Sequence, residues 1–236
     1  MSFNIFIVEV AIIISVGLLL YFNGYSGLRK KPKIKKNQIK VACVGDSITY
    51  GFGLSNWPKN NYPRQLQKLL GKDYNVANFG VSGSCAGTFA DLPYVRTKVY
   101  LKSLEYNSDI LVFMIGSNDS KYQNWTNKEQ FKKEYLALLN SYKKDGNIRI
   151  YLCTIAKAFF KKDDSIFTNY KIQPDKVEEI AEIIKEIANE NGYSLIDVNE
   201  LTKYHHEWFS EDQVHPNKEG ALAIAKLVYE SIIASE

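Results

Sequence analysis

The chain is poor in cysteine, and its three cysteines predict no disulfide framework. Cys43 and Cys153 lie in short apolar runs, where cysteine behaves as a small hydrophobic residue, and Cys85 lies in a glycine-rich loop. The chain also lacks a phosphate-binding loop, a dinucleotide-binding fingerprint, and the His-Glu-x-x-His and paired-cysteine patterns of zinc proteins. We therefore expect no cofactor and no metal ion.

A broad excess of charge of one sign is also lacking. The formal net charge is +4, but seven of the 30 basic residues lie between positions 29 and 40, and Glu9 is the only acidic residue before position 41. The rest of the chain is therefore close to neutral, which gives no electrostatic reason to expect a nucleic-acid partner. With 236 residues, 45% of them hydrophobic, the composition is that of an ordinary globular domain.

One long apolar run is present, from residue 5 to residue 22, interrupted by Glu9, Ser15 and Gly17. As a helix it would measure about 27 Å, the lower limit for crossing a bilayer. No basic residue precedes it and no Ala-x-Ala cleavage site follows it. We expect a single-pass membrane anchor over 1–24, a basic juxtamembrane linker over 25–39 and a folded domain over 40–236. The positive-inside rule favours the cytoplasmic side for the domain, although a basic linker would also bind anionic headgroups.

Strand and helix patterns alternate along the folded domain. Apolar runs predict strands at 40–44, 74–78, 109–115, 148–153 and 194–198, and helical spacing predicts helices at 63–70, 96–106, 127–142, 174–191 and 217–233. This alternation predicts a five-stranded parallel sheet with helices on both faces, a three-layer α/β/α sandwich of the flavodoxin-like type. Functional sites in such sheets gather at the carboxyl ends of the strands.

Two segments far apart in the chain supply the parts of a nucleophilic acyl-transfer site. Ser47 directly follows the first predicted strand in the run Gly45-Asp46-Ser47, although these residue types are also ordinary in turns. His215 lies just before the last helix, with Asp212 three residues upstream. A serine nucleophile, a histidine base and an acid that orients the histidine are recognised by their roles, whatever their order in the chain.

Two further segments could supply hydrogen-bond donors to a developing oxyanion. Residues 78–83 read Asn-Phe-Gly-Val-Ser-Gly after the second strand, and residues 116–119 read Gly-Ser-Asn-Asp after the third. A glycine N–H and an asparagine side-chain amide are suitable donors. Tight turns favour the same residue types, so each segment alone is ambiguous. Together with the Ser47 and Asp212–His215 segments they make four ordered segments at the expected places, which favours an active site.

These four segments together resemble the SGNH hydrolases, also called GDSL esterases and lipases, over residues 41–235. The resemblance implies that Ser47 is the nucleophile, that His215 is the base and that Asp212 orients it. It also implies an oxyanion hole formed by the N–H groups of Ser47 and Gly80 and the side chain of Asn118. The first segment has isoleucine where leucine is usual, a change that leaves the chemistry intact.

Segments 56–63 and 118–125 resemble a subgroup associated with carbohydrate O-acetyl esters. We therefore predict a membrane-anchored serine esterase that removes a short acyl group, acetyl above all, from a sugar or polysaccharide. Aromatic side chains in the loops could stack on sugar rings or simply pack the loops. Five residues are candidates for substrate binding: Asp46, Trp57, Tyr62, Trp125 and Lys157. Further aromatic residues in these loops are Tyr50, Phe52, Phe89, Tyr94 and Tyr122.

Other functions remain open at this stage. The acyl group could be transferred to a sugar hydroxyl instead of water, because the covalent intermediate is the same. The site could instead act on lipid acyl esters or thioesters beside the bilayer, or could be vestigial in a tethered binding module. Ser82 and Ser84 are alternative nucleophiles by position. A metal site built from His205, His206 and His215 is disfavoured, since adjacent histidines point apart in regular structure. The oligomeric state is not predicted.

Overall fold

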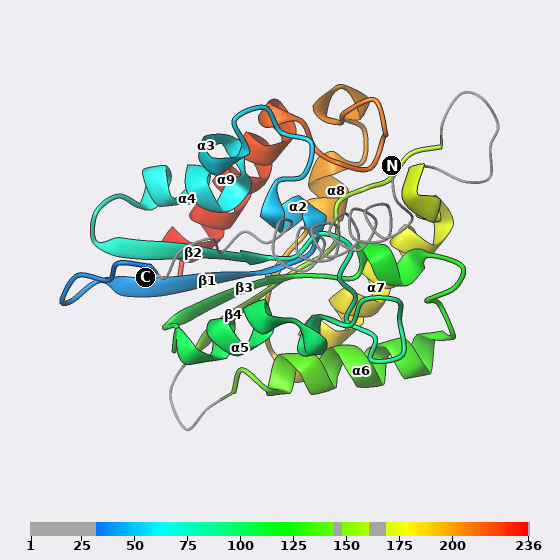
Figure 1. The fold of residues 1–236 in the computed structure, drawn as a ribbon, viewed down its shortest axis with the longest axis horizontal. Helices are drawn as coiled ribbons and strands as arrows, with labels where there is room; N and C mark the ends of the chain where they lie inside the picture. Colours follow the sequence, from blue (N-terminus) through cyan, green and yellow to red (C-terminus); the bar gives the residue numbers. More distant parts are fainter. Residues whose placement is uncertain (1–31, 144–147, 161–168, 236) are drawn as a thin grey trace, which may run out of the picture.

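A five-stranded parallel sheet forms the centre of the molecule (Figure 1). The computed structural model describes residues 32–143, 148–160 and 169–235. The strands are β1 (Ile39–Gly45), β2 (Tyr74–Gly80), β3 (Ile110–Met114), β4 (Arg149–Cys153) and β5 (Ser194–Ile196), in the order β2-β1-β3-β4-β5. This is the flavodoxin-like order, so the predicted sheet is confirmed. The order reverses at β1, which places a crevice at the carboxyl ends of β1 and β3.

Helices cover both faces of the sheet, which makes three layers (Figure 1). On one face lie α3 (Trp57–Asn60), α4 (Tyr62–Leu70) and α9 (Lys218–Ile233); on the other lie α5 (Lys98–Glu105), α6 (Lys128–Asn140) and α7 (Pro174–Asn191). Successive residues of a strand point to opposite faces. In β1, Val41 and Cys43 therefore join the core beneath α4 and α9, while Ala42 and Val44 join the core beneath the other helices.

Local capping accounts for two differences between the predicted and observed elements. The last strand ends at Ile196, two residues early, because Asp197 accepts a hydrogen bond from the Glu200 N–H and caps α8 (Val198–Thr202). The helix predicted at 96–106 is divided into η1 (Tyr94–Arg96) and α5. The division falls at Thr97, which is extended and whose hydroxyl accepts the Tyr100 N–H at 3.1 Å.

Several one-turn helices lie in the connections between the longer elements and were not predicted, because they are too short to show helical periodicity. They are α2 (Ser47–Tyr50), α3, η2 (Ser117–Ser120), η3 (Asn169–Lys171) and η4 (His206–Trp208). The predicted cap of α6 is half formed. Asn127 accepts the Gln130 N–H at 2.9 Å, but the Gln130 side chain donates to Glu134 at 2.9 Å and does not accept the Asn127 N–H.

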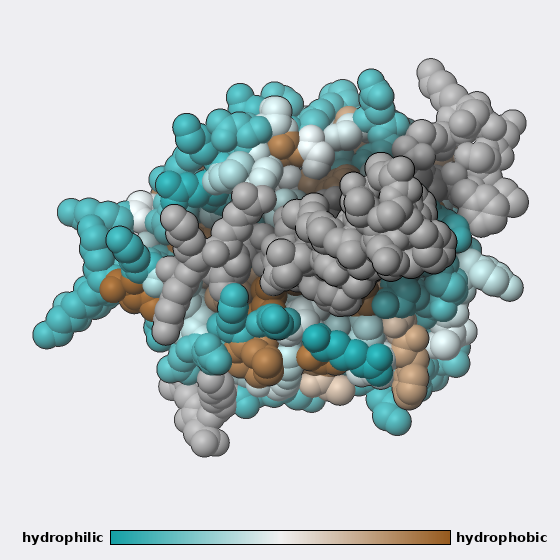
Figure 2. Space-filling view, viewed as in Figure 1, coloured by the Kyte–Doolittle hydropathy of each residue, from teal (hydrophilic) through white to brown (hydrophobic). Residues whose placement is uncertain are grey.

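The predicted membrane anchor over 5–22 lies outside the described residues. Within the described ranges, no helix is long and apolar enough to cross a bilayer. The end of the predicted linker belongs to the folded domain, because the Gln38 side chain donates to the Lys72 and Tyr74 carbonyls at 2.8 and 3.2 Å. Hydrophilic residues cover most of the described surface seen in Figure 2, with small hydrophobic patches between them.

Candidate active site

Ser47 lies at the carboxyl end of β1, where the chain turns sharply into α2. Asp46 caps this helix: its Oδ1 accepts the Ile48 N–H at 3.0 Å. Its side chain is buried, and burial raises the pKa of the Asp46 carboxyl, an effect that the Ile48 hydrogen bond partly offsets. The structure therefore gives Asp46 a role in holding the turn that presents Ser47. The predicted substrate-binding role of Asp46 is not supported.

The fold brings Ser47, His215 and Asp212 into one hydrogen-bonded chain. Ser47 Oγ lies 2.9 Å from His215 Nε2, and His215 Nδ1 lies 2.7 Å from Asp212 Oδ2. The second oxygen of Asp212 accepts the N–H groups of Val214 and His215 at 3.0 and 2.9 Å. With Nδ1 donating to the carboxylate, Nε2 is free to accept the serine proton. This arrangement can generate a serine nucleophile.

The loop that carries His215 is held by main-chain hydrogen bonds. Ser210 N–H donates to the His215 carbonyl at 2.8 Å, and Gln213 N–H donates to the Ser210 carbonyl at 2.9 Å. Gln213 adopts a left-handed conformation, with φ of 58°. That turn lets Asp212 reach both the main chain and the ring of His215. The imidazole is therefore oriented before any substrate binds.

The environment of Asp212 favours the ionised carboxylate. Burial raises its pKa, but the hydrogen bond and charge of the His215 ring, together with the main-chain N–H groups of His215 and Val214, outweigh burial. The net effect is a pKa below the ordinary value for aspartate. Asp212 is thus ionised at neutral pH and places a negative charge beside the imidazole.

Acid should destabilise the wild-type protein in part through Asp212. Because its folded pKa is lower than the unfolded value of about 3.9, the ionised carboxylate adds stability above that value. This contribution is lost as the pH falls through the folded pKa. We expect the Tm difference between wild type and Asp212→Asn to shrink as the pH falls below about 4. A Tm difference that stays constant over this range would contradict the assignment.

A pocket of about 320 Å³ opens over Ser47 and His215. Its described lining residues are Ser47, Phe52, Ser82, Gly83, Ser117, Asn118, Lys121, Tyr170, Ile172, Val214 and His215. Asn118, predicted as an oxyanion donor, is among them. One of its amide hydrogens is directed to the Ser84 carbonyl, 3.2 Å away. The second amide hydrogen is left for a ligand in the pocket.

Gly80 is not part of this pocket, which corrects the prediction that it supplies an oxyanion donor. Its N–H donates to Asn78 Oδ1 at 2.9 Å, and a Cβ at this position would collide with the backbone of Tyr50. Gly80 therefore allows β2 to approach α2 closely. Three residues later, Gly83 lines the pocket with a φ of +83°, which favours glycine. Among the described residues, no acceptor is recorded for the Gly83 N–H.

Two carboxylates hold the loop that follows Gly83. Asp119 accepts the N–H groups of Ala86 and Gly87 at 3.0 and 2.8 Å, and Glu134 accepts the N–H and hydroxyl of Thr88 at 3.0 and 2.6 Å. Burial raises the pKa of Asp119 to about 7, against the effect of its two hydrogen bonds. The contacts tie this loop to the segment that carries Asn118. Sequence reasoning missed this role, since Asp119 had the appearance of a turn residue.

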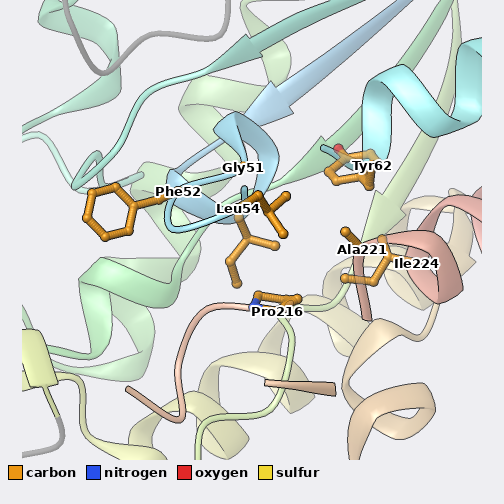
Figure 3. Close-up of a pocket in the computed structure, with 8 residues that line it drawn as sticks. Gly51, Phe52, Leu54, Tyr62, Pro216, Ala221 and Ile224 are labelled. Atoms are coloured by element: carbon orange, nitrogen blue, oxygen red, sulfur yellow. The ribbon is translucent and has the colours of Figure 1, made fainter. Parts of the chain in front are cut away.

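Two candidate substrate-binding aromatics lie outside the pocket. Tyr62 is the first residue of α4; it is only 1% exposed and packs against the sheet. It lines a second cavity, shown in Figure 3 with Leu54 and with Ala221 and Ile224 of α9. That cavity measures about 10 Å³, room for one water at most. Trp57 contacts Tyr50, with ring centroids 4.7 Å apart. The predicted binding roles of Tyr62 and Trp57 are therefore not supported.

The other two candidates also have structural partners away from the pocket. Trp125 packs against Phe131, with ring centroids 6.0 Å apart, and Lys176 Nζ lies 5.0 Å from the Trp125 ring. Lys157 Nζ pairs with a Glu178 carboxylate oxygen at 2.8 Å. Neither residue lines the pocket. For Trp125, the structure favours packing within the loops over stacking on a sugar ring.

Phe52 and Tyr170 form an aromatic wall beside His215. Their ring centroids lie 4.8 and 5.3 Å from that of His215, and 5.9 Å from each other. Tyr170 has a φ of 68°, an unusual conformation for a bulky residue. Phe52 was among the aromatic candidates. No sequence signal marked Tyr170, which reaches the pocket from a distant part of the chain.

The described residues contain no group of three or more histidine, cysteine, aspartate or glutamate side chains placed to hold a metal ion. His205 stacks on Trp208 with ring centroids 3.6 Å apart, and His206 lies against Phe159 at 3.7 Å. These two histidines therefore pack on aromatic rings, while His215 faces Ser47.

Residues 43–223 match the GDSL-like lipase/acylhydrolase family. The chain belongs to this family. The matched region is an acylhydrolase domain, of the class that hydrolyses ester bonds. An acetylxylan esterase from Xylanibacter ruminicola is 32% identical over 223 residues, which cover 87% of this chain and 45% of that protein. This chain thus spans about half the length of that relative.

Solved structures share the fold. A carbohydrate acetylesterase family member from Sinorhizobium meliloti superposes with a TM-score of 0.68 and 20% identity, covering 84% of this chain and 98% of that one. An acetyl xylan esterase superposes with a TM-score of 0.63 and 23% identity, covering 82% of this chain and 100% of that one. The predicted resemblance to the SGNH hydrolases and to their carbohydrate acetylesterase subgroup is confirmed.

Proposed function

We propose that the protein is a serine esterase that removes acetyl groups from a carbohydrate. The observation that carries this proposal is the chain of hydrogen bonds from Ser47 through His215 to Asp212, at the base of a pocket. The acetylxylan esterase relative and the carbohydrate acetylesterase fold neighbours support acetyl as the acyl group and a sugar as the alcohol. No cofactor is needed for this chemistry.

The reaction uses two acyl-transfer steps. Ser47 Oγ attacks the ester carbonyl carbon while His215 Nε2 takes the serine proton, and the N–H groups of Ser47 and Gly83 with the Asn118 amide bind the oxyanion. His215 then returns the proton to the departing sugar oxygen, which leaves acetyl on Ser47. Water, deprotonated by His215, attacks this acyl-enzyme and releases acetate. Asp212 stabilises the imidazolium in both steps.

Exposed aromatic residues near the pocket support a carbohydrate substrate. Phe89 and Tyr122 are 86% and 80% exposed. Their loops are neighbours, because Asp91 N–H donates to Asn124 Oδ1 at 2.9 Å. The second loop continues directly from Asn118 in the pocket. Aromatic faces in such positions can stack on the sugar units of a polymer.

Asn118→Ala should lower kcat by about 10²–10³-fold, because one oxyanion donor is removed in the transition state. Its control is Asn127→Ala, which removes the cap of α6 at a residue that does not line the pocket. The control should cost about 1 kcal/mol of stability with little change in kcat. The measurement is steady-state hydrolysis of 4-nitrophenyl acetate. A kcat for Asn118→Ala within about threefold of wild type would remove Asn118 from the oxyanion hole.

The proposed function is tested with 4-nitrophenyl acetate, butyrate and octanoate, followed by acetylated xylo-oligosaccharides with release of acetate measured. We expect acetate to be the best acyl group and all turnover to depend on Ser47. A preference for octanoate would favour a lipase or thioesterase instead. Transfer of acetyl to added sugar alcohols, in place of free acetate, would favour the acyltransferase.

We also propose that residues 5–22 anchor the enzyme in a membrane, on the strength of the apolar run and the basic residues that follow it. The full chain should remain with membranes after alkaline extraction, whereas a chain lacking residues 1–31 should not. Protease protection in closed vesicles then reports whether the catalytic domain lies on the cytoplasmic side, which the positive-inside rule favours. Extraction of the full chain into the soluble fraction would refute the anchor.

A further inference from the structure

Lys121 brings a positive charge to the pocket. Among the described lining residues it is the sole lysine or arginine, and none of them is an aspartate or glutamate. It follows the turn η2, where its N–H donates to the Asn118 carbonyl at 3.3 Å. Its side chain is 12% exposed. The side chain is thus largely buried, and it lines the same pocket as Asn118.

The Lys121 ammonium group has no hydrogen-bond acceptor among the described residues. It forms an ion pair with Asp91, but Asp91 Oδ2 lies 3.8 Å away, which is too far for a hydrogen bond. Asp91 already accepts hydrogen bonds from the Asn124 and Gln123 side chains, at 2.9 and 3.3 Å. The three N–H donors of Lys121 therefore remain for an anionic group of a substrate in the pocket.

The position of Lys121 favours the alcohol side of the ester. The acyl carbonyl must lie between Ser47 and the oxyanion donors, so the alcohol extends outward along the pocket. Lys121 is followed directly by the exposed Tyr122, and its partner Asp91 lies in the same loop as the exposed Phe89. Lys121 therefore borders the aromatic surface to which a sugar chain is assigned above.

We propose that Lys121 is a specificity-determining residue that binds a carboxylate on the sugar. The preferred substrate is then an acetyl ester on or beside a hexuronic acid residue. This inference rests on the proposed esterase function and narrows its substrate class. The relevant interaction is a charge-assisted hydrogen bond from the ammonium to the sugar carboxylate.

The test compares two soluble esters, a mono-acetylated methyl glucuronoside and the matching methyl glucoside. Wild type should prefer the glucuronoside, and the preference should weaken as ionic strength rises. In Lys121→Met the ratio of the two kcat/KM values should fall by about tenfold or more, mainly through KM for the acid. Lys121→Arg should keep the preference. Asp91→Asn should raise it, because a competing carboxylate is removed.

Some outcomes would overturn the inference. Equal losses of kcat/KM for both esters in Lys121→Met would mean that Lys121 supports the reaction or the fold and does not bind a substrate anion. A Lys121-dependent preference for 4-nitrophenyl hemisuccinate over butyrate would place the anion on the acyl group instead of the sugar. A ratio unchanged within about twofold in Lys121→Met would show that no substrate carboxylate is bound there.

A binding measurement, which needs no turnover, distinguishes failure of the esterase proposal from failure of the Lys121 site. Calorimetry on Ser47→Ala should show tighter binding of methyl glucuronoside than of methyl glucoside, and the difference should vanish in Ser47→Ala/Lys121→Met. Sugar-acid binding with no hydrolysis by wild type would refute the esterase and retain the Lys121 site. Hydrolysis without any difference in binding would refute the Lys121 site alone.

Discussion

Ser47→Ala should reduce kcat for 4-nitrophenyl acetate by about 10⁴–10⁶-fold. Ser47 Oγ is the atom that would form the acyl-enzyme, and it is already hydrogen-bonded to His215 Nε2. Without that oxygen, only the oxyanion donors and substrate binding remain, and direct attack by water is slow. Because the substitution removes one atom from a small side chain, Tm should stay within about 2 °C of wild type.

Ser82→Ala is the matched control for the nucleophile. Ser82 also lines the pocket, and it was an alternative nucleophile by its position in the chain. Its hydroxyl has no hydrogen-bond partner among the described residues, so no base activates it. We expect Ser82→Ala to retain kcat within about tenfold. A larger loss in Ser82→Ala than in Ser47→Ala would overturn the assignment of the nucleophile.

His215→Ala should reduce kcat by about 10⁶-fold, and Asp212→Asn by about 10⁴-fold. The base takes and returns the proton directly, whereas the aspartate acts through the ring that it orients. Asn at position 212 can still hydrogen-bond to the ring, but as a neutral side chain it stabilises the imidazolium less and allows the wrong tautomer. Steady-state rates of the purified variants measure both effects.

The double variant Ser47→Ala/His215→Ala provides a control for the idea that these residues act as one unit. Its rate should be close to that of either single variant, because removing one member already disables the other. Independent, multiplicative losses would contradict a shared function. An Asp212→Asn enzyme slower than His215→Ala would show that Asp212 does more than orient and stabilise the imidazole.

Much of the fold could be predicted because its signals are local. The buried strands are short apolar runs, and the helices show helical spacing with identifiable ends such as Pro174 and Gly192. The least accurate boundaries lie where a single side chain competes with the regular element, as at Thr97 and Asp197. The parallel sheet with helices on both faces followed from the alternation of strands and helices together with the resemblance to a known family.

From the sequence alone, Ser47 and Asn118 could be placed after predicted strands, and Asp212 and His215 just before the last helix. The tertiary structure decided which of two nearby glycines faces the pocket. Both Gly80 and Gly83 suit a turn, but only Gly83 lines the pocket, whereas the Gly80 N–H donates to Asn78 Oδ1 within β2.

The walls of the pocket were likewise decided only by the tertiary structure. Phe52, Lys121 and Tyr170 come from three separate segments, and each local sequence is compatible with an ordinary exposed loop. Trp125 and Lys157 have side chains suited to substrate binding, but they contact Lys176 and Glu178 outside the pocket. Burial and pairing depend on contacts between residues far apart in the chain. No local pattern encodes them, and they govern which substrate the pocket admits.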